Sequence, residues 1–151
     1  PMRTPMLATL LLAAIPLTAC DWDDGVPHQD ARELCVQRIN EYRATEGKPP
    51  YKRWKSGEEC ADEEARLDSE SGQAHGAFPM CGERAQNECP GWGSIDSTVG
   101  GCLDMMWAEG PGEPFSEHGH YLNMSSTSYT EVACGFYITP GGSVWAIQNF
   151  R

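Results

Sequence analysis

Seven cysteines in a chain of 151 residues constrain the fold more than any other feature of this sequence. Cys20 ends the uncharged N-terminal segment, and an even number remains. These are Cys35, Cys60, Cys81, Cys89, Cys102 and Cys134. No two of them have the C-x-x-C spacing typical of zinc knuckles. In an exported chain an even set of this kind predicts a disulfide framework of three bridges rather than a thiolate metal site.

The positions of the six cysteines favour one pairing among the many that are open. The first two lie near the N-terminal ends of two predicted helices, and only a short loop separates the fourth from the fifth. The third and the sixth both precede glycine in segments expected to be extended, so they could meet across a sheet. We therefore expect the bridges Cys35–Cys60, Cys89–Cys102 and Cys81–Cys134, with Cys81–Cys89 as an alternative.

The N-terminal segment predicts export. Arg3 is followed by an uncharged run from Thr4 to Ala19 that contains the apolar stretch "MLATLLLAAIP". A basic residue before a short apolar run is typical of a secretory signal, and this run is too short to span a bilayer comfortably. Its end, "LTAC", resembles the bacterial lipobox, in which the cysteine is acylated and becomes the first mature residue. We predict a lipoprotein signal peptide at residues 1–19 and lipidation of Cys20, with an ordinary cleaved signal as the alternative.

The charge balance excludes one class of partner. The formal net charge of −11 at pH 7 repels phosphate backbones and so disfavours nucleic acid. It also disfavours adhesion to anionic lipid through a basic patch, which leaves an acyl chain on Cys20 as the tie to a bacterial membrane or cell envelope. The segment "CDWDDGVPHQ" is short, acidic and turn-prone. It predicts a tether at residues 20–29, before a single domain at residues 30–151.

Hydrophobic periodicity predicts three helices in the first part of this domain. They lie in "DARELCVQRINEYRA" with Asp30 as N-cap, in "GEECADEEARLDSESG" with its acidic residues as a solvated face, and in "SIDSTVGGCLDMMWAEG" with Ser94 or Asp96 as N-cap. The residues expected to face inward are Leu34, Cys35, Ile39 and Tyr42 in the first helix, Cys60, Ala61, Ala65 and Leu67 in the second, and Val99, Cys102, Leu103, Met106 and Trp107 in the third.

Strand patterns close the domain. After the turn-rich "GPGEPFSEHG", the sequence gives strand-like "HYLNM" and then the strands "EVACGFYI" and "SVWAIQNF", with "TPGG" as a hairpin turn between the last two. Helices followed by antiparallel strands predict an α+β layered domain.

The order of several short motifs resembles a known family. "AH" follows the second helix, and "CGERAQN", "MMWAE", "GHY", "VACGFY" and "VWAIQNF" come after it in that order. From about Ala31 to Phe150 the chain resembles the CAP superfamily, also called the SCP domain, which includes the cysteine-rich secretory proteins, antigen 5 and plant pathogenesis-related 1 proteins. The resemblance implies an α-β-α sandwich, with an antiparallel sheet between helical layers, here stapled by disulfides.

The resemblance also implies a cleft that holds two histidines and two acids. Carried over by motif, these residues are His75, Glu83, Glu109 and His120, while His118 is expected to be a loop neighbour. Two neutral imidazoles can bind Zn²⁺ or another divalent metal, and adjacent carboxylates can orient the rings or act as general bases. The alternative is a hydrogen-bonded His–Glu network that ties the layers together and binds metal weakly.

Two positions next to these motifs depart from the family pattern. Arg84 follows the first acid, where the family usually has asparagine. Leu122 and Asn123 follow "HY", where the family favours Thr-Gln. Both departures flank the expected cleft, so we expect its polarity to differ from that of the family while the two histidines and two acids remain.

Two functions are compatible with such a cleft. Members of the family are secreted and are often linked to lipid or sterol binding, so the resemblance implies a cell-surface module that binds a lipid, sterol or envelope ligand. The alternative is a metal-dependent hydrolase or peptidase, with His75 and His120 as metal ligands and Glu83 or Glu109 as the catalytic base. The sequence lacks both an H-E-x-x-H motif and a G-x-S-x-G elbow. The binding module is therefore favoured over the enzyme.

Overall fold

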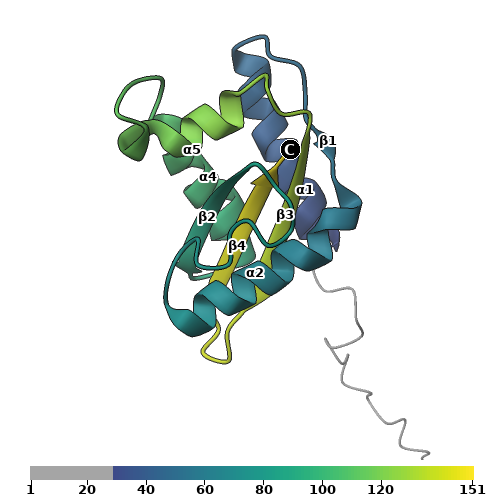
Figure 1. The fold of residues 1–151 in the computed structure, drawn as a ribbon, viewed down its shortest axis with the longest axis vertical. Coiled ribbons are helices and arrows are strands. Elements are labelled where there is room, and N and C mark those ends of the chain that lie inside the picture. The colour runs from purple at the N-terminus through teal and green to yellow at the C-terminus, as the bar shows by residue number, and fades with distance from the viewer. Residues whose placement is uncertain (1–28) are drawn as a thin grey trace, which may run out of the picture.

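The structure is a computed structural model that describes residues 29–151 (Figure 1). Three predictions lie outside the described residues: the signal peptide at 1–19, lipidation of Cys20, and the tether up to residue 28. In chain order the elements are α1 (Gln29–Thr45), β1 (Lys52–Arg53), η1 (Lys55–Gly57), α2 (Glu58–Ser71), β2 (Ala85–Trp92), α3 (Ile95–Ser97), the π-helical turn η2 (Thr98–Cys102), α4 (Leu103–Ala108), α5 (Phe115–Ser125), β3 (Glu131–Ile138) and β4 (Val144–Phe150). Within the described part, every helix falls short of the length and apolar character that a membrane span requires.

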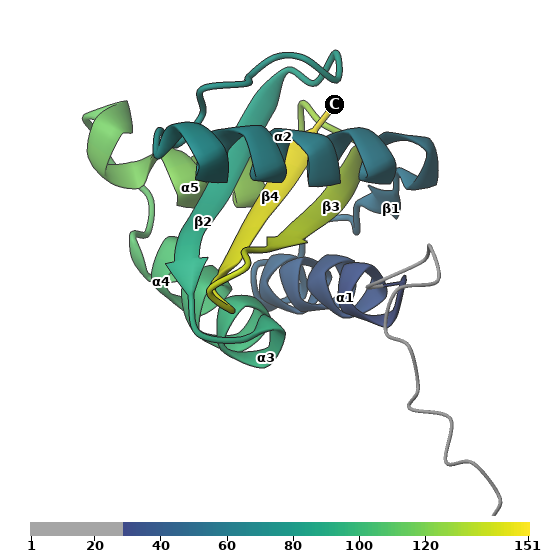
Figure 2. The same cartoon turned by 90° about the horizontal axis from the view of Figure 1, so that it is seen from below.

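A four-stranded sheet in the order β1-β3-β4-β2 forms the middle layer. β1 pairs in parallel with β3, and the other neighbours pair antiparallel. Figure 2 shows α2 lying across one face of this sheet, while α1, α3 and α4 lie against the other face. The predicted α-β-α sandwich of an α+β fold is thus confirmed.

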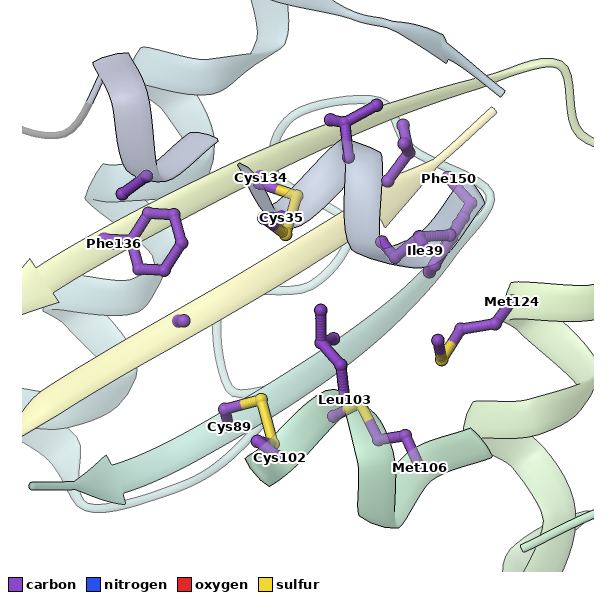
Figure 3. Close-up of a cluster of buried hydrophobic side chains, with 14 of the residues drawn as sticks. Cys35, Ile39, Cys89, Cys102, Leu103, Met106, Met124, Cys134, Phe136 and Phe150 are labelled. Carbon is purple, nitrogen blue, oxygen red and sulfur yellow. A yellow bond between two sulfur atoms is a disulfide. The ribbon is translucent and has the colours of Figure 1, made fainter. Parts of the chain in front are cut away.

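The larger hydrophobic core lies between the sheet and the layer of α1 and α4 (Figure 3). Alternate residues of a strand point to opposite faces, so Cys134 and Phe136 of β3 face α1 together with Phe150 of β4. Two disulfides cross this core: Cys35–Cys134 joins α1 to β3, and Cys89–Cys102 joins β2 to η2.

The opposite face of the sheet has a much smaller apolar contact, formed by Ala61 and Ala65 of α2 with Ile147 of β4. The helix lies so close to β3 that a Cβ on Gly135 would come within 2.3 Å of the Ala61 carbonyl carbon. Because of this close approach, the acidic residues beside the alanines are covered too: Glu64 is 0% exposed and Asp68 1%. Glu58, at the start of α2, is buried as well. The prediction that the acids of α2 form a solvated face is therefore wrong for these three residues.

Two of the three predicted disulfides are also wrong. Cys89–Cys102 is confirmed, but Cys35 pairs with Cys134, and Cys60 pairs with Cys81. Cys35 lies on α1 and Cys60 on α2, so the whole sheet separates them. Cys81 cannot meet Cys134 across the sheet because Cys134 points into the α1 layer, whereas the loop that carries Cys81 folds back along α2.

The segment from Phe115 to Ser125 is helical, so the predicted strand at "HYLNM" is wrong. The predicted turn-rich segment is irregular as expected up to Pro114 and is wrong only from Phe115 onward. Tyr121, Met124 and Ser125 are buried at the i, i+3 and i+4 spacing of a helix that packs on α4 and β2. Helix α1 begins at Gln29, so Asp30 is inside the helix rather than its N-cap. Leu34, expected to face inward, is half exposed. The Ser94 cap of α3 is confirmed, since its side chain accepts a hydrogen bond from the backbone N–H of Ser97.

Candidate functional site

His75 lies in the loop between α2 and β2, and its backbone is held in an unusual conformation. Its φ angle of 59° is the only positive φ of a non-glycine residue in the described part of the chain. The backbone N–H of His75 donates to Glu88 Oε2 at 2.6 Å, so a buried carboxylate of β2 holds this conformation. Such conformations persist only where neighbouring groups fix them, and they are frequent at functional sites.

A hydrogen-bond chain fixes which nitrogen of His75 carries the proton. Glu64 Oε2 and Asn149 Oδ1 accept hydrogen bonds from Gln86 Nε2 at 3.2 and 3.1 Å. The amide oxygen of Gln86 therefore faces the His75 ring, where it lies 2.8 Å from Nδ1. This oxygen can only accept, so Nδ1 carries the proton and Nε2 keeps a free lone pair.

His120 is oriented in the same way from another part of the fold. Glu109, which caps the C-terminal end of α4, accepts from the backbone N–H of His120 at 3.0 Å and from that of Tyr121 at 3.3 Å. Its other oxygen lies 2.5 Å from His120 Nδ1, so this ring also offers Nε2. A carboxylate that holds a histidine through the nitrogen remote from the ligand position is typical of metal-binding histidines.

His118 is a helical residue rather than the loop neighbour that was expected. Its Nδ1 lies 2.8 Å from the carbonyl oxygen of Glu109 and 2.9 Å from that of Gly110, so it ties α5 to the end of α4. Residues two positions apart on a helix point in nearly opposite directions. His118 therefore has a structural role in joining two helices, and His120 is the ring available to a ligand.

A cavity of about 320 Å³ opens beside His75. It lies between the loop before β2, the start of β2, α5 and the segment before β3. Its lining residues are His75, Phe78, Arg84, Ala85, Gln86, Phe115, Asn123 and Tyr129. Phe78 and Phe115 are 39% and 59% exposed, which is unusual for phenylalanine. Arg84, one of the departures from the family pattern, packs its guanidinium over the Tyr129 ring and thus places a fixed positive charge in the wall.

Three side-chain amides connect the two histidines through β2: Gln86, Asn87 and Asn123. The sequence motifs did not indicate Gln86 and Asn87 as site residues. Gln86 points to the α2 side and holds His75. Asn87 points to the other side, where it donates to the carbonyl oxygen of His120 at 3.0 Å and accepts from Asn123 Nδ2 at 2.9 Å. The consecutive polar residues of "AQNE" within a buried strand were the available signal.

The acids of the site are distributed differently from the motif assignment. Glu109 pairs with His120 as expected, but the carboxylate in contact with His75 belongs to Glu88, whose Oε2 lies 3.8 Å from Nδ1. Glu83 is buried and faces Glu64 of α2. Burial is the main cause that raises the pKa of Glu64 to about 7; a hydrogen bond from Asn149 lowers this pKa, and the facing Glu83 raises it.

One cluster of three metal-ligating side chains occurs among residues 29–151, and it contains neither histidine. Its members are Glu64, Cys81 and Glu83, whose ligand atoms lie within 4.8 Å of one another. Cys81 is bonded to Cys60, so its sulfur is not a thiolate and is not available as a metal ligand. The cluster is therefore a pair of buried carboxylates.

The chain also matches a known family. A family model described as "CAP: Cysteine-rich secretory protein family" matches residues 36–150, so the chain belongs to the CAP family. No curated protein matches the sequence.

Solved structures share the fold at low sequence identity. BmVAL-1 has a TM-score of 0.62 at 17% identity, with 81% of this chain and 76% of that chain covered. Schistosoma mansoni venom allergen-like protein 4 has a TM-score of 0.52 at 12% identity, with 81% and 88% covered. Na-ASP-1 has a TM-score of 0.58 at 11% identity, with 93% of this chain but only 43% of that chain covered. These likenesses show the fold alone.

Proposed function

We propose that this CAP-family protein is a cell-surface binding module whose ligand enters the cavity beside His75. The observation that carries this proposal is the combination, in one cavity of about 320 Å³, of aromatic walls with a few fixed polar groups. Mostly apolar cavities of this size with a small number of placed polar groups are typical of small-molecule sites.

The chemistry of the walls indicates the class of ligand. Phe78, Phe115 and Tyr129 offer apolar surface to the body of a ligand, whereas Arg84 and His75 offer a charge and a hydrogen-bonding ring to its head. An amphiphile such as a lipid, sterol derivative or other envelope component has both parts. The acyl chain proposed on Cys20 would hold the module at a bacterial membrane, where ligands of this class are abundant.

The histidines add a metal-binding function to this proposal. Because Gln86 and Glu109 hold the Nδ1 atoms, the Nε2 atoms of His75 and His120 are the ones that would bind Zn²⁺ or another divalent metal. The same hydrogen bonds also form a structural network. The network and the metal site are compatible, because the bonds that join the layers also orient the two imidazole rings.

A binding titration with a fluorescent fatty acid or sterol analogue tests the ligand proposal. Replacing Phe115 by alanine removes exposed apolar surface from the wall, and we expect affinity to fall about tenfold. Ile138→Ala is the matched control, since Ile138 is equally an exposed apolar residue but does not line the cavity. The proposal is wrong if the wild-type protein shows no saturable binding, or if Phe115→Ala and Ile138→Ala bind as tightly as wild type.

A further inference from the structure

We propose that Arg84 is a specificity-determining residue, which selects an amphiphile with an anionic head group for the cavity beside His75. The head would be a carboxylate or a phosphate, since both present the same kind of anionic oxygens to a guanidinium. This inference rests on the proposed function and specifies the ligand within it. Arg84 directly precedes β2 and lines the cavity together with aromatic residues.

The lining of this cavity carries one permanent charge, and that charge is positive. The lining residues include Arg84 but no aspartate or glutamate. The chain as a whole has the opposite character, with 22 acidic and 11 basic residues and a formal net charge of −11. Because the field of such a protein repels anions, an anionic ligand is favoured only where a cation is locally uncompensated.

Arg84 is such a cation. Among residues 29–151, every arginine except Arg43 and Arg84 forms an ion pair with an aspartate or a glutamate. Arg43 is buried, and its guanidinium donates to backbone carbonyl oxygens. Arg84 is exposed, so within this part of the chain it is the arginine whose charge is both accessible and without an acidic partner.

Two contacts hold the guanidinium of Arg84 in place without neutralising it. The guanidinium carbon lies 5.0 Å from the centre of the Tyr129 ring, and Nη2 donates to the carbonyl oxygen of Ser128. Neither partner is charged, so the positive charge stays available. A guanidinium presents its donors in a planar fork that matches two oxygens of a carboxylate or a phosphate. Because the group is already oriented, less conformational entropy is lost when a ligand binds.

The buried acids that touch this wall offset its charge only in part. Glu64 accepts a hydrogen bond from Gln86, and Glu88 accepts one from the backbone N–H of His75. Burial raises the pKa of both carboxyl groups to about 7, so at neutral pH each carries well under its full negative charge. Glu64 also interacts with Glu83, and a proton shared between these two leaves the pair with one negative charge.

Binding of four dodecyl compounds at neutral pH tests the inference, followed by displacement of an uncharged fluorescent lipid analogue. The compounds share one apolar chain and differ in the head group: dodecanoate, monododecyl phosphate, dodecanol and dodecylamine. We expect at least one of the two anions to bind wild type about tenfold more tightly than dodecanol, and dodecylamine to bind most weakly. The comparison of the two anions identifies the preferred head group.

Variants of Arg84 separate its charge from its part in the wall. Arg84→Gln removes the charge, so the affinity for the preferred anion should fall about tenfold while the affinity for dodecanol stays unchanged. Arg84→Lys keeps the charge without the fork and should keep part of the preference. Arg66→Gln is the matched control, because it removes the same charge from α2 outside the cavity and should bind like wild type.

The outcomes distinguish this inference from the proposed function. If wild type binds the anions and dodecanol equally well, the cavity is a ligand site, but the inference about Arg84 is wrong. The inference is also wrong if Arg84→Gln weakens all four compounds alike, since Arg84 then only supports the wall. If none of the four compounds binds to wild type, the proposed function and the inference fail together.

Discussion

The two faces of the sheet are packed by different means. On the α1 and α4 side, sixteen buried residues form a continuous apolar cluster that two disulfides cross. On the α2 side the buried apolar cluster has three residues, and around it lie buried acids and amides, among them Glu64, Asp68, Glu88 and Asn149. The first face owes its stability to apolar burial, which does not depend on pH. The second face buries carboxyl groups, and burial raises the pKa of Glu64 and of Glu88 to about 7, so the stability of this face depends on pH.

The largest expected effect is on the α1 face. Phe150 is fully buried and packs against the rings of Tyr51 and Tyr129 at centroid distances of 5.6 and 6.0 Å. Phe150→Ala should lower the free energy of unfolding by about 3–5 kcal/mol, measured by denaturant titration. The loss should be nearly the same at pH 5 and pH 8, because no titrating group is removed. Met105→Ala, at an exposed position of α4, should change stability by less than about 0.5 kcal/mol. A strongly pH-dependent loss for Phe150→Ala would contradict the contrast between the faces.

The second effect is on the α2 face and depends on pH. Burial raises the pKa of Glu88 to about 7 from an unperturbed value of 4.5; the hydrogen bond from the His75 backbone opposes this rise, and Asp68 adds to it. A carboxyl whose pKa is raised on folding favours the folded state at low pH. The contribution of Glu88 is therefore fully present below about pH 4.5 and is lost as pH rises towards about 7.

Glu88→Gln sharpens this expectation. The wild-type protein should lose about 2–3 kcal/mol of unfolding free energy through Glu88 between pH 4.5 and neutral pH, and the variant should lose correspondingly less. Denaturant titrations across this range measure the difference. Glu117→Gln, at an exposed position of α5, is the control and should follow the wild-type curve. Parallel curves for wild type and Glu88→Gln would show that Glu88 titrates normally in the folded state.

The smallest expected effect on stability concerns the two histidines, which are held from opposite faces. Gln86 orients His75 from the α2 side, and Asn87 holds the backbone of His120 from the other side. Calorimetric titration with Zn²⁺ should show binding to wild type that weakens as pH falls through about 6.5. His75→Ala and His120→Ala should each abolish it while the disulfide-linked fold remains.

His118→Ala provides the matched control for the zinc titration. Because the Nδ1 of His118 is engaged with two carbonyl oxygens, its loss should weaken the join between α4 and α5 but leave zinc affinity unchanged. Equal zinc affinity in wild type, His75→Ala and His120→Ala would contradict the proposed site. Unfolding of either variant would show that its ring is required for the hydrogen-bonded network that joins the layers.

Much of the fold could be predicted from local sequence patterns. Helices α1 and α2 and strands β3 and β4 each have a hydrophobic period of their own, and the turn between the two strands has a turn signal. Helix α5 lacked one: it contains Gly119 and starts after Pro114, and its burial depends on packing against α4 and β2. The hydrogen bonds around His75 could not be predicted from local sequence patterns either. The bond from Asn149 to Glu64 joins residues 85 positions apart, and nothing in a local window indicates that an acid of α2 is buried by alanines beside it.

The Cys60–Cys81 bridge anchors the loop that forms part of the cavity wall. It closes a ring with a sequence separation of 21. The ring runs along α2 from Cys60, continues through the loop after the helix, and ends at Cys81 before β2 begins. The exposed part of this ring carries His75 and Phe78, two residues of the cavity wall. Since the covalent closure fixes both ends, one cut by a protease in the loop between α2 and Cys81 would not release a fragment. Substitutions in this exposed loop leave the packed part of α2 unchanged, whereas Ala61 and Ala65 of the same ring lie against the sheet and have little room to change.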